Sequence, residues 1–140
     1  MTYHPTHFKL QELVAPAIHA TRGERAWELL RPGALMALDT LRDRFGPLVV
    51  NNWHLGGTYK ESGLREFGTR TGAAFSMHKY GGAYDCKFRD HGPREVYAYI
   101  LEHPQEFPTI TALENIESTP TWLHFDDRNH GRTGIWVVNP

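Results

Sequence analysis

Two short segments alternate between apolar and polar side chains, and this pattern restricts the fold more than any other feature of the sequence. Successive residues of a strand point to opposite faces. In residues 82–88 one face carries Asp85, and in residues 121–128 one face carries His124. The opposite faces are apolar, with Tyr84, Cys86 and Phe88 in the first segment and Leu123 and Phe125 in the second. We therefore expect both segments to be strands whose apolar faces are covered by helices.

The N-terminal third of the chain predicts these helices. Residues 32–45 place Leu35, Leu38, Leu41 and Phe45 at helical spacing, with Pro32 in the first turn and Gly46 after the end. Shorter helices are expected at residues 7–14 and 24–30. In the first of these, four apolar side chains would point inward: Phe8, Leu10, Leu13 and Val14.

The remainder of the chain predicts short strands, one helix and one long loop. Strands are expected at residues 47–53, 82–88, 108–115, 121–128 and 135–138, with a turn at 116–120. A helix is expected at residues 93–103, and residues 54–75 form an irregular loop, of a length typical of functional loops. Helices first and a mainly antiparallel sheet later indicate an α+β fold.

Length and composition narrow the class of protein. The 140 residues suit one domain, 1–140, and the net charge of −1 with a pI near 6.7 gives no sign of nucleic-acid binding. The single cysteine, Cys86, excludes an internal disulfide and is expected to be a buried, inert thiol. We find no signal-like start, no membrane anchor and no sign of an obligate protein partner. The chain is expected to be made in a cytoplasm.

The segment from Ser76 to Asp85 carries the chemistry. His78 precedes a glycine turn, Gly81-Gly82, which leads into the strand that bears Asp85. Imidazole and carboxylate are both good zinc ligands, and glycines permit the tight reversal that brings them together. With His124 on a neighbouring strand, they form a predicted His-Asp-His metal site.

These residues resemble the signature of a family of wall peptidases. The zinc D-alanyl-D-alanine carboxypeptidases, vancomycin-resistance dipeptidases and phage L-alanyl-D-glutamate endopeptidases share Ser-x-His-x-x-Gly-x-Ala-x-Asp, followed by Trp-x-His. This chain matches it at Ser76, His78, Gly81, Ala83 and Asp85, then at Trp122 and His124. The resemblance implies a hedgehog-like α+β fold, a catalytic zinc ion (Zn2+) and peptidoglycan stem peptides as substrate.

The resemblance also implies roles for residues around the metal. Arg65, in Ser-Gly-Leu-Arg, corresponds to an arginine that binds substrate and stabilises the developing oxyanion, although Leu64 stands where relatives have an aromatic residue. Ser76 is expected to hydrogen-bond near the site or to bind the substrate's carboxylate. Trp122 is expected to line the site.

The general base is the least defined part of the predicted site. Several relatives have an acid three residues before the last histidine, where this chain has Thr121. Glu114, Glu117 and Asp126 are the candidates. Glu114 is preferred because it would lie across a hairpin from His124, whereas Glu117 falls in the turn and Asp126 could orient a ligand. In the expected mechanism Glu114 takes a proton from a zinc-activated water and passes it to the leaving amine.

Three functions stay open at this stage. The preferred one is a phage-type lysin, acting on the cell wall after release from the host cytoplasm. The second is a carboxypeptidase or dipeptidase for D-Ala-D-Ala ends. The third is a zinc-stabilised phage structural or binding protein without turnover, which the missing acid at Thr121 keeps open.

Overall fold

The computed structural model describes residues 2–140 and has an α+β fold. Its helices are α1 (Pro16–Arg22), α2 (Pro32–Phe45) and α3 (Pro93–Glu102). Its strands are β1 (Leu48–Val49), β2 (Ala83–Phe88), β3 (Ala112–Glu114), β4 (Leu123–Asp126) and β5 (Trp136–Val138). Short 3-10 turns lie at Leu10–Glu12, Gly23–Leu29, Trp53–Leu55, Met77–Tyr80 and Pro104–Glu106.

The five strands form one mixed sheet in the order β1-β2-β4-β3-β5. The pairs β1–β2, β2–β4 and β4–β3 are antiparallel, and β5 joins β3 in parallel. The sheet is therefore mainly antiparallel, as the sequence predicts. The register pairs Asp85 directly with His124.

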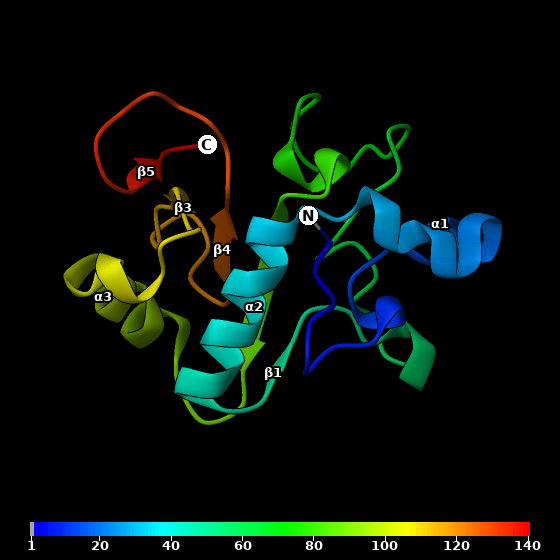
Figure 1. The fold of residues 1–140 in the computed structure, drawn as a ribbon, viewed down its shortest axis with the longest axis horizontal. Coiled ribbons are helices and arrows are strands. Elements are labelled where there is room, and N and C mark those ends of the chain that lie inside the picture. The colour runs from blue at the N-terminus through cyan, green and yellow to red at the C-terminus, as the bar shows by residue number, and fades with distance from the viewer. Residues whose placement is uncertain (1) are drawn as a thin grey trace.

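One face of this sheet is covered by helices, and Figure 1 shows α2 crossing in front of β2 and β4, with α1 and α3 to either side. The apolar side chains of both strands belong to one buried core together with the inward face of α2. Tyr84, Cys86, Leu123 and Phe125 are fully buried there, beside Leu38. The predicted division of each strand into an apolar and a polar face is confirmed, and Cys86 lies on the apolar side.

The N-terminal predictions are correct in burial but partly wrong in secondary structure. Phe8, Leu10, Leu13 and Val14 are all buried, yet only the 3-10 turn at Leu10–Glu12 is helical, because Val14 bridges to Leu64 as a single parallel β-bridge. The predicted helix at 24–30 is likewise a 3-10 turn. Helix α1 was not predicted. None of its residues is buried, so its sequence lacks the regular spacing of apolar residues by which a helix is recognised.

The other predicted elements are found with shorter bounds. Helix α2 begins and ends where its proline and glycine predict, and α3 begins at Pro93. The strand predicted at 47–53 is paired only at Leu48–Val49, and residues 54–75 are mostly irregular.

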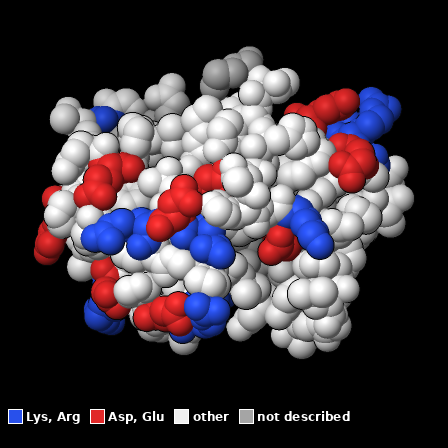
Figure 2. Space-filling model, turned by 60° about the horizontal axis from the view of Figure 1, so that its bottom comes forward, with Lys and Arg blue, Asp and Glu red and all other residues white. Residues whose placement is uncertain are grey.

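In the described part of the chain no helix has the length and apolar character that a bilayer span requires. Figure 2 shows a face on which basic and acidic side chains are interspersed.

Asp39 of α2 fixes the N-terminal segment to the core. Its buried carboxylate accepts hydrogen bonds from the Tyr3 hydroxyl (2.7 Å), the Thr6 backbone N–H (2.7 Å) and the His7 backbone N–H (3.2 Å). One turn further on, Asp43 is 69% exposed, and within residues 2–140 its only hydrogen bond is with the His7 ring. The two aspartates therefore form a matched pair for testing this anchor.

We predict that Asp39→Ala lowers the free energy of unfolding by about 2–4 kcal/mol, because three donors lose their acceptor in a buried setting. Asp43→Ala should lower it by less than about 1 kcal/mol. Urea denaturation followed by circular dichroism measures both values. Equal effects of the two substitutions would show that Asp39 does not anchor the segment.

Candidate metal centre

Three buried side chains converge on the polar face of the sheet. The ligand atoms of His78, Asp85 and His124 all lie within 4.8 Å of one another, so the group could hold a metal ion. Asp85 Oδ1 is 3.2 Å from His78 Nε2 and 2.9 Å from His124 Nδ1. Two ligands bound at about 2.0–2.1 Å to a tetrahedral zinc ion lie about 3.4 Å apart. These two separations differ from that value by a few tenths of an ångström, and the third pair of ligand atoms lies within 4.8 Å.

The turn before β2 places the first of these ligands. Ser76 precedes the 3-10 turn Met77–Tyr80, and its hydroxyl oxygen accepts a hydrogen bond from the His78 backbone N–H (3.3 Å). Gly81 ends the turn with φ of +75°, in the left-handed region that favours glycine, and a Cβ there would lie 1.9 Å from the Leu29 carbonyl oxygen. Gly81 is thus required by both conformation and space. Ser76 supports the turn and lies on the cavity wall.

The second nitrogen of each histidine is held by its own acceptor. His78 Nδ1 donates to the Gly63 carbonyl oxygen (2.9 Å), and His124 Nε2 bonds to Asp126 Oδ2 (2.9 Å). These bonds orient both rings so that the remaining nitrogens face Asp85. Metal-binding histidines are commonly oriented in this way by a carbonyl or carboxylate. The donor set and its supporting hydrogen bonds therefore fit a divalent metal ion.

The charges of the site stabilise one another when no metal is bound. Burial raises the pKa of Asp85, but the neighbouring His78 and His124 outweigh burial and hold it well below its usual range. Burial lowers the pKa of His124, but hydrogen bonds to Asp126 and Asp85 raise it to about 9. The His124 ring thus carries a proton on the nitrogen that faces Asp85. A metal ion has to displace that proton, so metal and proton compete at this atom.

Arg65 lies against the carboxylate of the candidate metal ligand Asp85. Its Nη2 is 3.3 Å from Asp85 Oδ2, and its Nε donates to the Glu61 carbonyl oxygen (2.6 Å). The guanidinium therefore holds one oxygen of Asp85 and leaves Oδ1 for the metal. It also places a fixed positive charge on the wall of the same cavity.

The three candidate bases have different surroundings. Glu114 Oε1 lies 3.8 Å from His124 Nδ1, the nitrogen that faces Asp85, and Glu114 lines the cavity. Glu117 is 70% exposed and forms an ion pair with Arg94 (2.6 Å). Asp126 is buried, bonds to the other nitrogen of His124 and is bound by the Arg128 guanidinium at 2.7 and 2.6 Å. Glu114 is the candidate that faces the metal-binding atoms.

A cavity of about 410 Å³ opens in front of the three ligands. Trp122 lines it, as do Arg128 and residues 71–73 of the long loop. Trp53 and Trp136 do not line this cavity. Trp53 Nε1 donates to the Val14 carbonyl oxygen, and the Trp136 ring packs against the Arg132 guanidinium. The length of the loop indicates a functional role, but neither its residues 71–73 nor Arg128 is predicted individually, because no ligand pattern marks them in the sequence.

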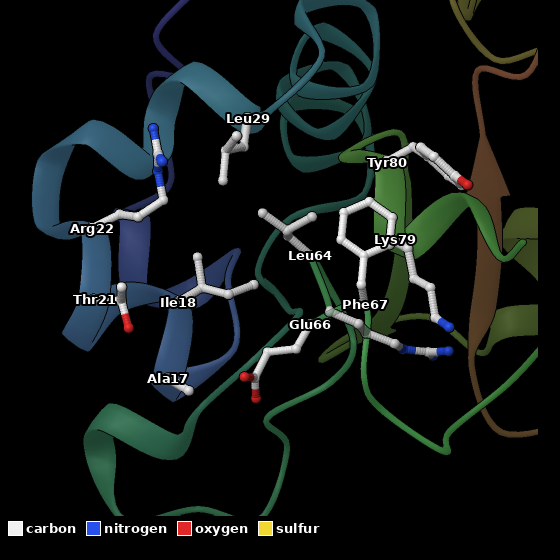
Figure 3. A pocket seen from close by; sticks show the side chains of 11 residues that line it. Ala17, Ile18, Thr21, Arg22, Leu29, Leu64, Glu66, Phe67, Lys79 and Tyr80 are labelled. Carbon is white, nitrogen blue, oxygen red and sulfur yellow. The ribbon is translucent and has the colours of Figure 1, made fainter. Parts of the chain in front are cut away.

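A separate apolar cavity of about 450 Å³ lies behind Arg65. Figure 3 shows Ile18, Leu29 and Leu64 around it, with Phe67 at its edge. None of the three ligand residues lines this cavity. This apolar cavity therefore gives no access to the metal centre, whereas the cavity in front of the ligands does.

We predict that the protein binds about one zinc ion per chain and that Asp85→Asn or His124→Ala abolishes tight binding. Asp126→Asn should weaken zinc binding about 10–100-fold, because His124 loses the charge that orients and polarises it. Asp127→Asn is the matched control: this carboxylate pairs with Arg31 (2.8 Å), and its substitution should change affinity less than about 3-fold. Titration against a chromogenic chelator measures these affinities. Equal losses for Asp126→Asn and Asp127→Asn would contradict the orienting role.

Similarity to other proteins adds no independent assignment. Neither a known protein-family model, nor a curated protein, nor a solved structure matches this chain. The metal-binding capacity of the centre follows from the positions of its three ligand side chains and of the groups that orient them.

Proposed function

We propose that this chain is a zinc-dependent peptidase that hydrolyses bonds in peptidoglycan stem peptides. The observation that carries the proposal is the convergence of His78, Asp85 and His124 on one face, with Glu114 beside them on the wall of an open cavity. Three protein ligands and an accessible fourth position are typical of catalytic rather than structural zinc sites. Zinc is preferred as the metal because two imidazoles and a carboxylate suit it among common divalent ions.

The chemistry of amide hydrolysis assigns a role to each group. A zinc ion, when bound, acts as a Lewis acid and lowers the pKa of a coordinated water toward about 7. Glu114 Oε1 is placed to accept the proton of the attacking water and to return it to the leaving amine. Arg65 supplies fixed positive charge where the carbonyl oxygen becomes negative. Asp126, through His124 Nε2, keeps that ring in the required orientation.

The choice of substrate rests on the resemblance of the Ser76–Asp85 and Trp122–His124 motifs to wall peptidases. The cavity agrees with a peptide substrate in two respects: it is open, and its wall combines cations with the Trp122 ring. A phage-type lysin, released from the host cytoplasm to act on the cell wall, is the form of the activity that we propose. An enzyme for D-Ala-D-Ala ends uses the same residues and differs in the bond it cuts.

A non-catalytic, zinc-stabilised protein is the alternative that the structure keeps open. Thr121 is exposed and supplies no acid at the position where several relatives have one. Under this alternative, Glu114 is only a partly exposed carboxylate at the end of β3. The two functions differ in whether a zinc-loaded sample releases peptides.

We predict that the zinc-loaded protein releases stem-peptide fragments from purified peptidoglycan, identified by mass spectrometry. New N-terminal D-Glu indicates an endopeptidase, and free D-Ala indicates a carboxypeptidase. Glu114→Gln should retain about one zinc ion and lower kcat about 10²–10⁴-fold, the usual contribution of a general base.

Glu117→Gln is the matched control, because this glutamate is exposed and paired with Arg94 on the surface. It should leave kcat within about 2-fold of the unsubstituted protein. No product from a zinc-loaded sample would favour the non-catalytic alternative. An active Glu114→Gln variant would assign the base to another residue.

A further inference from the structure

The cavity in front of the metal ligands continues into a second cavity of about 310 Å³ on the other side of Asp85. Arg65, Thr71, Asp85 and Trp122 line both cavities, so the two form one path across the metal centre. The outer wall of the second cavity is made by residues 58–62 and Lys87. A peptide with its scissile bond at the metal would therefore place neighbouring groups in this second cavity.

Lys87 is the unusual residue of this wall. It lies two positions after Asp85 on the same face of β2, and it is only partly exposed. Its Nζ donates to the Val50 carbonyl oxygen (2.7 Å), the Ser62 hydroxyl (2.9 Å) and, weakly, the Asp85 carbonyl oxygen (3.3 Å). It also lies 4.0 Å from the centre of the Tyr59 ring. All these partners are electrically neutral groups.

Among residues 2–140 neither lysine of this cavity forms an ion pair, and the Asp85 and Glu61 carboxylates of the wall attract Lys87 and Lys60 only at longer range. Within residues 2–140, no carboxylate oxygen lies within 4 Å of the nitrogen of Lys87, nor of that of Lys60 at the rim. The one other acid in the wall, Glu61, accepts hydrogen bonds from the Thr69 and Thr71 hydroxyls. Asp85 faces Arg65 and the two histidines. A partly buried cation without a partner is costly, and a bound anion would offset this cost.

We propose that this second cavity binds a carboxylate of the substrate peptide close to the scissile bond. Lys87 supplies the positive charge that binds the carboxylate. Of its three hydrogen bonds, the long one to the Asp85 carbonyl oxygen is the one that a carboxylate oxygen can replace most readily. Lys60 adds a second positive charge at the rim. This inference rests on the proposed peptidase function and names the chemical group that its substrate must carry.

Two carboxylates of a stem peptide meet this description. In an L-Ala-D-Glu bond, the α-carboxylate of D-Glu is attached to the carbon that bears the scissile nitrogen. In a D-Ala-D-Ala bond, the terminal carboxylate occupies the same position. The shared requirement is a free carboxylate one carbon away from the nitrogen of the cleaved amide.

The test uses three synthetic pentapeptides that differ in one group each. The reference is L-Ala-D-Glu-L-Lys-D-Ala-D-Ala, linked through the γ-carboxyl of D-Glu. The second has D-isoglutamine in place of D-Glu, and the third has a C-terminal amide. We expect kcat/KM to fall about 10–100-fold for one of the two amides, as when one partner of a desolvated charge pair is removed. The amide that loses activity identifies the carboxylate that is bound.

Lys87→Met should remove this preference by lowering kcat/KM for the reference peptide about 10–100-fold while leaving the affected amide within about 3-fold. Because the Lys87 bonds join β2 to Val50 and Ser62, this variant could fold poorly, so its Tm is measured alongside. Lys60→Glu alters only an exposed residue of the rim and should reduce the same preference about 3–10-fold. A preference that survives both substitutions, or equal cleavage of all three peptides, overturns the proposal.

Binding separates this inference from the proposed function. Affinities of the three peptides for the zinc-loaded Glu114→Gln variant are measured by NMR titration, without turnover. Tighter binding of the reference peptide, with shifts at residues 59–62 and 87, supports the carboxylate site even if the unsubstituted protein cleaves nothing. Cleavage without any carboxylate preference keeps the peptidase and removes the carboxylate site. Absence of both cleavage and selective binding removes both.

Discussion

The direct pairing of Asp85 with His124 across β2 and β4 is the contact on which the rest of the site depends. Residues opposite each other in an antiparallel pair have Cα atoms about 4.5–5.5 Å apart, so their side chains meet without any help from loops. A shift of the register by one residue would place one ligand in the core and the other at the surface. The apolar residues that alternate with them, Tyr84 and Phe125, therefore fix the metal centre by fixing the register.

The same alternation explains why a cluster of charges is tolerated beside a closely packed core. Charges of opposite sign follow one another through the site, from Arg65 to Asp85, then His124, Asp126 and Arg128. Each buried group has a partner at hydrogen-bond distance, which limits the cost of removing it from water. In this arrangement a metal ion would take the place of the proton between Asp85 and His124, while the outer partners keep both imidazole rings in place.

The parts of the fold that were predictable from sequence are those whose pattern reports burial. Helix α2 has a complete apolar period together with a proline start and a glycine stop, and its bounds were found. Helix α1 buries none of its residues, and the segment around Leu13 is held by a bridge to Leu64, a contact that no local pattern encodes. The strands were predicted too long because apolar content continues past the last paired residue, as Val50 shows.

The same distinction applies to the site. His78, Asp85 and His124 could be proposed as a group because Asp85 and His124 lie on the polar faces of alternating strands, and because the motifs around all three resemble those of wall peptidases. Glu114 was expected opposite His124 because the two segments were predicted to form a hairpin. The structure pairs Leu113 with Phe125, so the next residues in this antiparallel register are Glu114 and His124. The environment of Lys87 could not be predicted, since its neighbours come from residues 50, 59 and 62, which only the folded chain brings together.

The most direct test of the account is a crystal structure of the zinc-loaded protein with anomalous diffraction measured at the zinc edge. The account predicts one anomalous peak per chain, about 2.0–2.2 Å from His78 Nε2, Asp85 Oδ1 and His124 Nδ1. A peak coordinated by other residues, or no peak at these three side chains in crystals that contain zinc, would contradict it.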